Sequence, residues 1–130
     1  LNRKLPFKDK SFDFVILSQT LQAVERPDRL LDEMLRVGNK VVISFINFGY
    51  YRARLQLLWH GRMPVTPTLP ETWYTTRNIH LATICDFRDL CRQTGVKIMH
   101  EVPLGHNFDF MARLSANLLA TTCVFVMTRP

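Results

Sequence analysis

Phe12-Asp-Phe-Val-Ile-Leu17 opens the strand–helix–strand pattern that decides the fold of this chain. The run is apolar except for Asp13, which is typical of a strand that a parallel sheet covers on both faces. Lys40-Val-Val-Ile-Ser-Phe-Ile46 is a second run of the same kind. A helical pattern separates the two runs, so we expect two parallel strands joined by a right-handed crossover.

The crossover helix should begin at Pro27, because the first turn of a helix leaves its N–H groups unbonded and proline has none. Its apolar residues recur at helical spacing and predict one buried face: Leu30, Leu31, Met34 and Leu35. Asp32 and Arg36 have the spacing of an i,i+4 ion pair. Gly38-Asn39 predicts the end of the helix, because both residues tolerate a positive φ.

The second half of the chain predicts two more helices and two more strands. A helix is expected over 49–60, and another between its cap Thr83 and Gly95. Strands should follow from Val96 and over Leu118–Met127, while 107–117 has no clear pattern. Because no helical pattern separates these strands, we expect an antiparallel closing pair.

Four strands leave one strongly apolar strand at a sheet edge with nothing to cover it, and such edges promote aggregation. The chain also lacks an initiating Met. We therefore expect residues 1–130 to be a single partial α/β domain, the rear part of a doubly wound sheet whose first strands precede Leu1.

Composition narrows the classes of function. The 130 residues suit one domain, and the 17 basic and 11 acidic residues give a net charge of +6. The basic residues are scattered rather than clustered, so a nucleic-acid-binding module remains only a weak alternative. No apolar run is long enough to cross a bilayer. Cys85, Cys91 and Cys123 form no Cys-x-x-Cys motif, so we expect three small buried side chains, no metal site and a reducing cytoplasm.

Candidate binding residues follow the two parallel strands. Ser18, Gln19 and Thr20 come after the first strand, and Asn47 comes after the second. Open α/β sheets bind their ligands at the carboxyl ends of the strands, which favours a binding role. The alternatives are that Ser18 and Thr20 cap the next turn, and that Asn47 only serves its own turn.

Residues 61–79 are expected to form a loop of functional length, rich in proline. Its Trp73 and Tyr74 could form a lid or a partner surface, or could fasten the loop to the core. The helix before it mixes aromatic and basic residues that could contact an anionic substrate or a protein partner, or could line a solvated helix face: Tyr50, Tyr51, Arg52 and Arg54.

Several separated blocks carry a family resemblance. Ser11-Phe-Asp-Phe-Val15 and Glu33-Met-Leu-Arg-Val37 resemble the FDxV and ExxRV motifs of class I methyltransferases that use S-adenosylmethionine. Four further blocks look like the MetW family, methionine biosynthesis protein W: Leu17-Ser-Gln-Thr-Leu-Gln-Ala-Val24, Ser44-Phe-Ile-Asn-Phe-Gly49, Gly61-Arg-Met-Pro64 and Asn78-Ile-His-Leu81. The resemblance covers nearly the whole chain and implies a Rossmann-like methyltransferase sheet with an antiparallel closing strand pair.

The resemblance also implies a function. Ser18, Gln19 and Thr20 would face the methyl end of the cofactor, and His80 stands where related enzymes place a pocket histidine. The alternative for His80 is a structural role, which is the more frequent role of a lone histidine. The family's Gly-rich loop and ribose-binding acid are missing, because all five glycines are isolated. We therefore expect S-adenosylmethionine to bind the full-length protein and not this chain.

MetW proteins are expected to work as partners of homoserine O-acyltransferase. An active methyltransferase acting on an unidentified small molecule is the alternative, so whether the protein is an enzyme stays open at this point.

Overall fold

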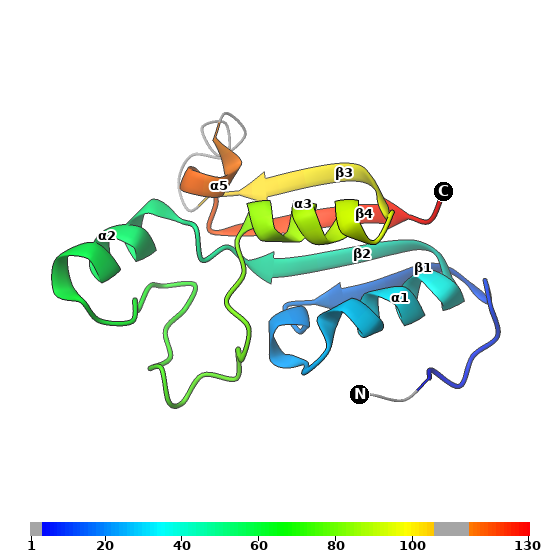
Figure 1. Ribbon diagram of the computed structural model, residues 1–130, viewed down its shortest axis with the longest axis horizontal. Helices are drawn as coiled ribbons and strands as arrows, with labels where there is room; N and C mark the ends of the chain where they lie inside the picture. Colours follow the sequence, from blue (N-terminus) through cyan, green and yellow to red (C-terminus); the bar gives the residue numbers. More distant parts are fainter. Residues whose placement is uncertain (1–3, 106–114) are drawn as a thin grey trace.

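The computed structural model describes residues 4–105 and 115–130. Figure 1 shows the chain order of the elements, which are β1 (Phe12–Ser18), the 3-10 helix η1 (Leu21–Ala23), α1 (Pro27–Val37), β2 (Gly38–Ile46), α2 (Tyr51–His60), α3 (Ile84–Gln93), β3 (Lys97–Leu104), α5 (Ala116–Leu119) and β4 (Thr122–Thr128). Most of the stretch without a clear sequence pattern, residues 107–114, lies outside the described residues.

The described strands form one mixed sheet in the order β1-β2-β4-β3. β1 and β2 are parallel, with Ile16 opposite Val42, and α1 forms the crossover between them. β4 runs antiparallel to both β2 and β3. The predicted strand–helix–strand unit, the antiparallel closing pair and the interior position of the last strand are confirmed, and the apolar strand β1 lies at an edge.

Gly38 is required for a reason that the sequence pattern missed. Helix α1 begins at Pro27 as predicted, but Gly38 has a φ of −108° and continues directly into β2. The helix ends after Val37 as predicted, but the prediction that a positive φ ends it is wrong. A Cβ atom on Gly38 would lie 2.6 Å from Cγ2 of Val15, so the close approach of β1 is what demands glycine here.

The core lies on one face of the sheet, where α1 and α3 both pack (Figure 1). Phe45 of β2 and Phe125 of β4 stack with ring centroids 5.7 Å apart. Phe87 of α3 packs 5.1 Å from the first ring and 4.7 Å from the second. Thr83 caps α3 as predicted, because its hydroxyl accepts the N–H of Asp86 at 3.2 Å. These contacts fix α3 over the centre of the sheet.

The opposite face of the sheet is bare within the described residues. Phe14 and Ile16 of β1 point to this face and are exposed, Ile16 by 71%. Val42 and Val126 continue the apolar surface across β2 and β4. The prediction that β1 is covered on both faces is wrong for this part of the chain, because both helices that pack on the sheet lie on the other face.

Arg36 has different partners from the predicted one. Its guanidinium forms ion pairs with Glu33 at 2.9 Å and Asp9 at 2.6 Å. Asp32 instead pairs with Arg129 near the end of the chain, at 2.7 Å. The predicted Asp32–Arg36 pair is wrong, because Asp32 has a distant partner in Arg129 and Arg36 pairs with its helix neighbour Glu33 and with Asp9.

Asn47 joins four segments at the carboxyl end of β2. Its side chain is buried, and Nδ2 donates to the carbonyl oxygens of Asn117 at 3.1 Å and Ala120 at 2.8 Å. Its Oδ1 accepts the backbone N–H groups of Gly49 at 3.0 Å and Ile84 at 3.3 Å. The amide therefore holds the starts of α2, α3 and α5 against the end of β2.

Replacing Asn47 with alanine should lower the free energy of unfolding by roughly 3 kcal/mol, because buried backbone groups lose their partners. Urea denaturation measures the change. Asn39→Ala is the matched control, since Asn39 is exposed and bonds only Asp13, at 3.4 Å, through its side chain. The control should change stability by less than about 0.5 kcal/mol. Equal effects of the two substitutions would contradict the structural role of Asn47.

Glu33 should make the fold sensitive to acid. Hydrogen bonds from Arg36 and from the backbone N–H of Leu5 hold the pKa of Glu33 at about 2, below its ordinary value of 4.5. A lowered folded-state pKa stabilises the fold above the unfolded-state value, and this contribution is lost as pH falls. The stability difference between the unaltered chain and Glu33→Gln should therefore be largest at neutral pH and shrink between pH 4.5 and 2. Urea denaturation at several pH values measures it, and a difference that stays constant between pH 4.5 and 2 would contradict the role of Glu33.

Candidate functional site at the carboxyl edge of the sheet

A pocket lies where the sequence predicts ligand binding, at the carboxyl ends of β1 and β2. Because these strands are parallel, both end at the same edge, and α2 and the loop after it extend beyond that edge (Figure 1). The pocket has a volume of about 210 Å³ and is lined by Gln19, Ile46, Thr68, Leu69, Pro70, Glu71, Arg77 and Asn78. Three segments far apart in the sequence therefore meet at this edge.

Gln19 is the predicted cofactor residue that reaches the pocket. Its φ is 48°, in the left-handed region that a residue other than glycine adopts at an energetic cost. Its N–H donates to the carbonyl of Ser44 at 2.9 Å. Strained residues of this kind gather at functional sites. The hydroxyl of Thr20 donates to the carbonyl of Ser18 at 2.8 Å, and the Ser18 hydroxyl accepts that of Ser44 at 3.4 Å, so both side chains shape the turn around Gln19.

Gln22 positions one wall of the pocket and escaped the sequence analysis. Its buried side-chain amide donates to the carbonyl of Ile46 at 3.0 Å and accepts the N–H of the same residue at 3.2 Å. Its own carbonyl accepts the N–H groups of Ile79 and His80, at 2.9 and 3.0 Å. Gln22 is the one polar residue of the segment Leu21–Val24, and this feature of the sequence could have indicated its role.

His80 lies beside the pocket and not in its lining. The side chain is exposed, and Nε2 lies 3.1 Å from the carbonyl oxygen of Glu25. Because a carbonyl only accepts hydrogen bonds, Nε2 must be the donor, which fixes the tautomer. The histidine that the resemblance singled out therefore ties the end of the loop to the segment before α1.

Two opposite charges, also missed from the sequence, line the pocket from the loop. Glu71 accepts the backbone N–H of Arg77 at 3.2 Å, and both residues line the pocket together with Asn78. A carboxylate, a guanidinium and an amide can hold both signs of charge in a small ligand. Glu71 is the one acidic residue in the predicted loop 61–79, and this feature of the sequence could have marked it as a candidate site residue.

Trp73 and Tyr74 do not fasten the loop to the core. Both side chains are largely exposed, and their rings contact each other with centroids 5.5 Å apart. The loop is held instead through Gln22, as described above. The alternatives of a lid or a partner surface remain for this pair.

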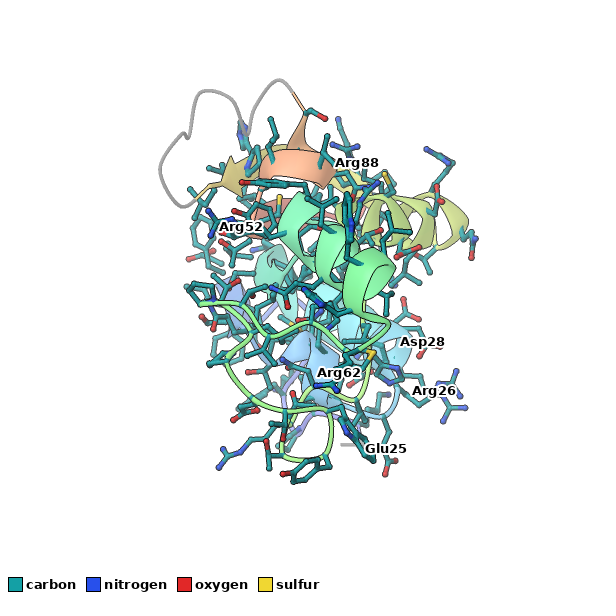
Figure 2. The ribbon with its side chains drawn as sticks, turned by 90° about the vertical axis from the view of Figure 1, so that its left-hand side faces the viewer. Glu25, Arg26, Asp28, Arg52, Arg62 and Arg88 are labelled. Carbon is teal, nitrogen blue, oxygen red and sulfur yellow. The ribbon has the colours of Figure 1, made fainter. Side chains whose placement is uncertain are left out.

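The other predicted site residues surround the base of α2. Asn47 points into the protein and does not line the pocket. Tyr50 is half-buried, and burial raises its pKa. The Nε of exposed Arg52 donates to Oη of Tyr51 at 3.3 Å, and this bond lowers the pKa of Tyr51. In Figure 2, Arg52 lies on the side of the molecule that α2 occupies.

The cysteines differ from the expectation at one position. Cys91 and Cys123 are buried free thiols, and burial raises the pKa of Cys91 to about 11 and that of Cys123 to about 12. Cys85 is exposed, so the prediction of three buried cysteines is wrong. Ile84, Phe87 and Cys91 form the buried face of α3, and position 85 falls on its other side.

Within residues 4–105 and 115–130, no group of three or more His, Cys, Asp or Glu side chains could hold a metal ion. None of the helices described there is long and apolar enough to span a membrane.

Within the described residues, the pocket alone does not fit S-adenosylmethionine. The pocket volume of about 210 Å³ is below the roughly 300 Å³ at which small-molecule sites begin. The sequence has no Gly-x-Gly turn that would let the backbone approach such a cofactor.

Comparisons with known proteins point to one family. The family model described as methionine biosynthesis protein MetW matches residues 3–127. The bifunctional methionine biosynthesis protein MetXA/MetW of Rhodopirellula baltica is 49% identical over 104 residues, which is 78% of this chain and 17% of that protein. The chain therefore corresponds to a small part of this relative.

Solved structures share the fold at low identity. An S-adenosylmethionine-dependent methyltransferase of Thermotoga maritima, described as a possible histamine N-methyltransferase, matches with a TM-score of 0.60 and 18% identity over 97% of this chain and 60% of its own. The cyclase SpnF matches with a TM-score of 0.58 and 17% identity over 97% of this chain and 53% of its own. Because one neighbour is named as a cyclase, the fold does not by itself determine the reaction.

The sheet order, the site at its carboxyl edge and the family model agree. The chain has part of a Rossmann-like methyltransferase fold, and it belongs to the MetW family of methionine biosynthesis proteins.

Proposed function

We propose that this chain is part of a methyltransferase-fold protein of methionine biosynthesis that binds a homoserine O-acyltransferase. The observation that carries the proposal is the 49% identical relative, whose name joins MetXA and MetW in one polypeptide. Fusion of two modules holds them at a high effective concentration, which benefits proteins that act on each other. The acyltransferase is the partner that the MetW resemblance implies.

We also propose that strands encoded ahead of Leu1 pair with β1 in the whole protein. The support is the apolar edge strand, where Phe14 and Ile16 are exposed on a face without a described helix. Exposed apolar edges are rare in stable proteins because they invite pairing with other chains. These strands would also carry the Gly-rich loop and the ribose-binding acid.

An active methyltransferase is the second candidate. It is supported by the strained Gln19, which lies in a pocket lined by Glu71 and Arg77. The cofactor would supply the methyl group, Gln19 would contact its methyl end, and the loop residues Glu71 and Arg77 would hold the acceptor. Methyl transfer draws much of its catalysis from close alignment of donor and acceptor, so the reaction needs no catalytic dyad.

A cytoplasmic location and no nucleic-acid role complete the proposal. The free thiols of Cys91 and Cys123 suit a reducing compartment. Ion pairs with the chain's own carboxylates engage five arginines: Arg26, Arg36, Arg88, Arg92 and Arg129. Such pairing leaves less charge for phosphates.

The partner proposal is tested by mixing the whole protein with the homoserine O-acyltransferase of the same organism. Size-exclusion chromatography should show one co-eluting complex, and the kcat of the acyltransferase should rise severalfold. Serum albumin in place of the MetW protein is the control, because any added protein can stabilise a dilute acyltransferase and so raise its apparent activity. Separate elution at about 10 μM of each protein, with kcat unchanged, would refute the proposal.

The second candidate is tested at Gln19. Gln19→Gly should relieve backbone strain and stabilise the whole protein by up to about 1 kcal/mol, while weakening S-adenosylmethionine binding about tenfold in calorimetry. Lys10→Gly is the matched control, because Lys10 has the other positive φ among the described non-glycine residues, at 53°, and does not line the pocket. Binding should be unchanged in the control. No heat of binding with the folded whole protein would eliminate this candidate.

A further inference from the structure

Helix α2 and the segment after it expose an unusual amount of apolar surface. Only Ala53 of the helix is buried. Six large apolar side chains within eleven residues are exposed: Leu55, Leu57, Leu58, Trp59, Met63 and Val65. Figure 1 shows α2 standing beyond the carboxyl edge of the sheet, away from the core helices. Single exposed apolar residues are ordinary, but a contiguous group marks an interaction surface.

This segment, residues 51–65, is called the α2 arm below, and it is well ordered by its own hydrogen bonds. Gly61 ends the helix with a φ of +59°, and its N–H donates to the carbonyl of Leu57 at 3.0 Å. The amide of Gln56 donates to the carbonyl of Val65 at 3.0 Å and accepts its N–H at 2.9 Å. A surface that is ordered before binding loses less entropy when a partner covers it.

The arm is also positively charged. Residues 49–70 contain Arg52, Arg54, His60 and Arg62 and no Asp or Glu. Within the described part of the chain, none of these three arginines forms an ion pair. Figure 2 shows Arg52 and Arg62 on the side of the molecule that α2 occupies. A partner that covers the arm therefore needs carboxylates around an apolar centre.

We propose that the α2 arm is the surface that binds the acyltransferase, with Leu58 and Trp59 inserted into an apolar groove that Asp and Glu side chains border. This inference rests on the proposed function and adds where and how the partner binds. Leu58 and Trp59 are 75% and 72% exposed. Tryptophan and arginine dominate the energetic centres of protein interfaces, and a helix lying in a groove is a common mode of recognition.

The arrangement suits a protein groove better than a second copy of the chain. At helical spacing, Leu55, Leu58 and Trp59 share one face of α2, whereas Leu57 lies on the opposite face with the buried Ala53. Apolar anchors at positions i, i+3 and i+4 are typical of a helix that binds in a groove. Two copies of the arm would carry the same positive charge and repel each other.

The test compares two tryptophans of equal exposure in the whole protein. Trp59 lies in the arm, and Trp73, at 73% exposed, lies outside it. Calorimetric titration of the acyltransferase should show that Trp59→Ala raises Kd at least about tenfold, while Trp73→Ala changes Kd less than about threefold. Leu58→Glu should abolish binding. Arg62→Glu should weaken binding and reduce the dependence of Kd on salt.

The outcomes separate this inference from the proposed function. If the unaltered protein binds the acyltransferase and Trp59→Ala and Leu58→Glu bind equally well, the arm is not the interface and only this inference is overturned. If the unaltered protein does not bind, both fail.

Three further measurements can overturn the inference. A fall in the melting temperature of Leu58→Glu would show that another segment of the same protein covers the arm. The second is dimerisation that substitutions in the α2 arm abolish, which would identify a second copy of the chain as the partner. The third is sedimentation with phosphatidylglycerol vesicles that substitutions in the α2 arm abolish without altering acyltransferase binding, which would identify a membrane as the partner.

Discussion

The side-chain amide of Asn47 is the interaction on which the arrangement of the functional edge depends. It bonds backbone groups of four residues in three other segments, and it does so inside the protein, where no water can replace it. Because α2 begins four residues later, the same amide determines where the α2 arm leaves the sheet. The core position of α3 and the exposed position of α2 thus have one origin.

The sheet places three different surfaces on one small chain. The edge strand β1 presents Phe14 and Ile16, the carboxyl edge presents the pocket around Gln19, and the α2 arm presents Leu58 and Trp59. A doubly wound sheet separates these surfaces naturally, because its faces bind helices and its carboxyl edge binds ligands. In the proposed function, the first surface completes the domain and the third binds the partner.

Much of the fold followed from local patterns. The bounds of α1, the cap at Thr83 and the directions of the strand pairs agree with the sequence patterns, since spacing and capping act within a few residues. The binding edge was also predictable, because Gln19 follows a parallel strand. Gln22 was missed because its role depends on a hydrogen bond to Ile46, which is distant along the chain. Arg77 was missed because it lines the pocket together with distant residues such as Gln19.

The amino-acid sequence alone determined the longer helices, the parallel pairing and the family, because each depends on periodicity or on short ordered motifs. The short elements η1 and α5 were not predicted, and Leu118–Leu119 belongs to α5 and not to the last strand. Only the tertiary structure decided the ion pairs between distant segments. Asp32 and Arg36 have ideal helical spacing, yet Asp32 pairs with Arg129 and Arg36 with Asp9 and Glu33. An exposed helical pair contributes only about 0.5 kcal/mol, so any better-placed partner displaces it. The exposure of the α2 arm was undecided for the same reason, since burial depends on what the fold brings next to it.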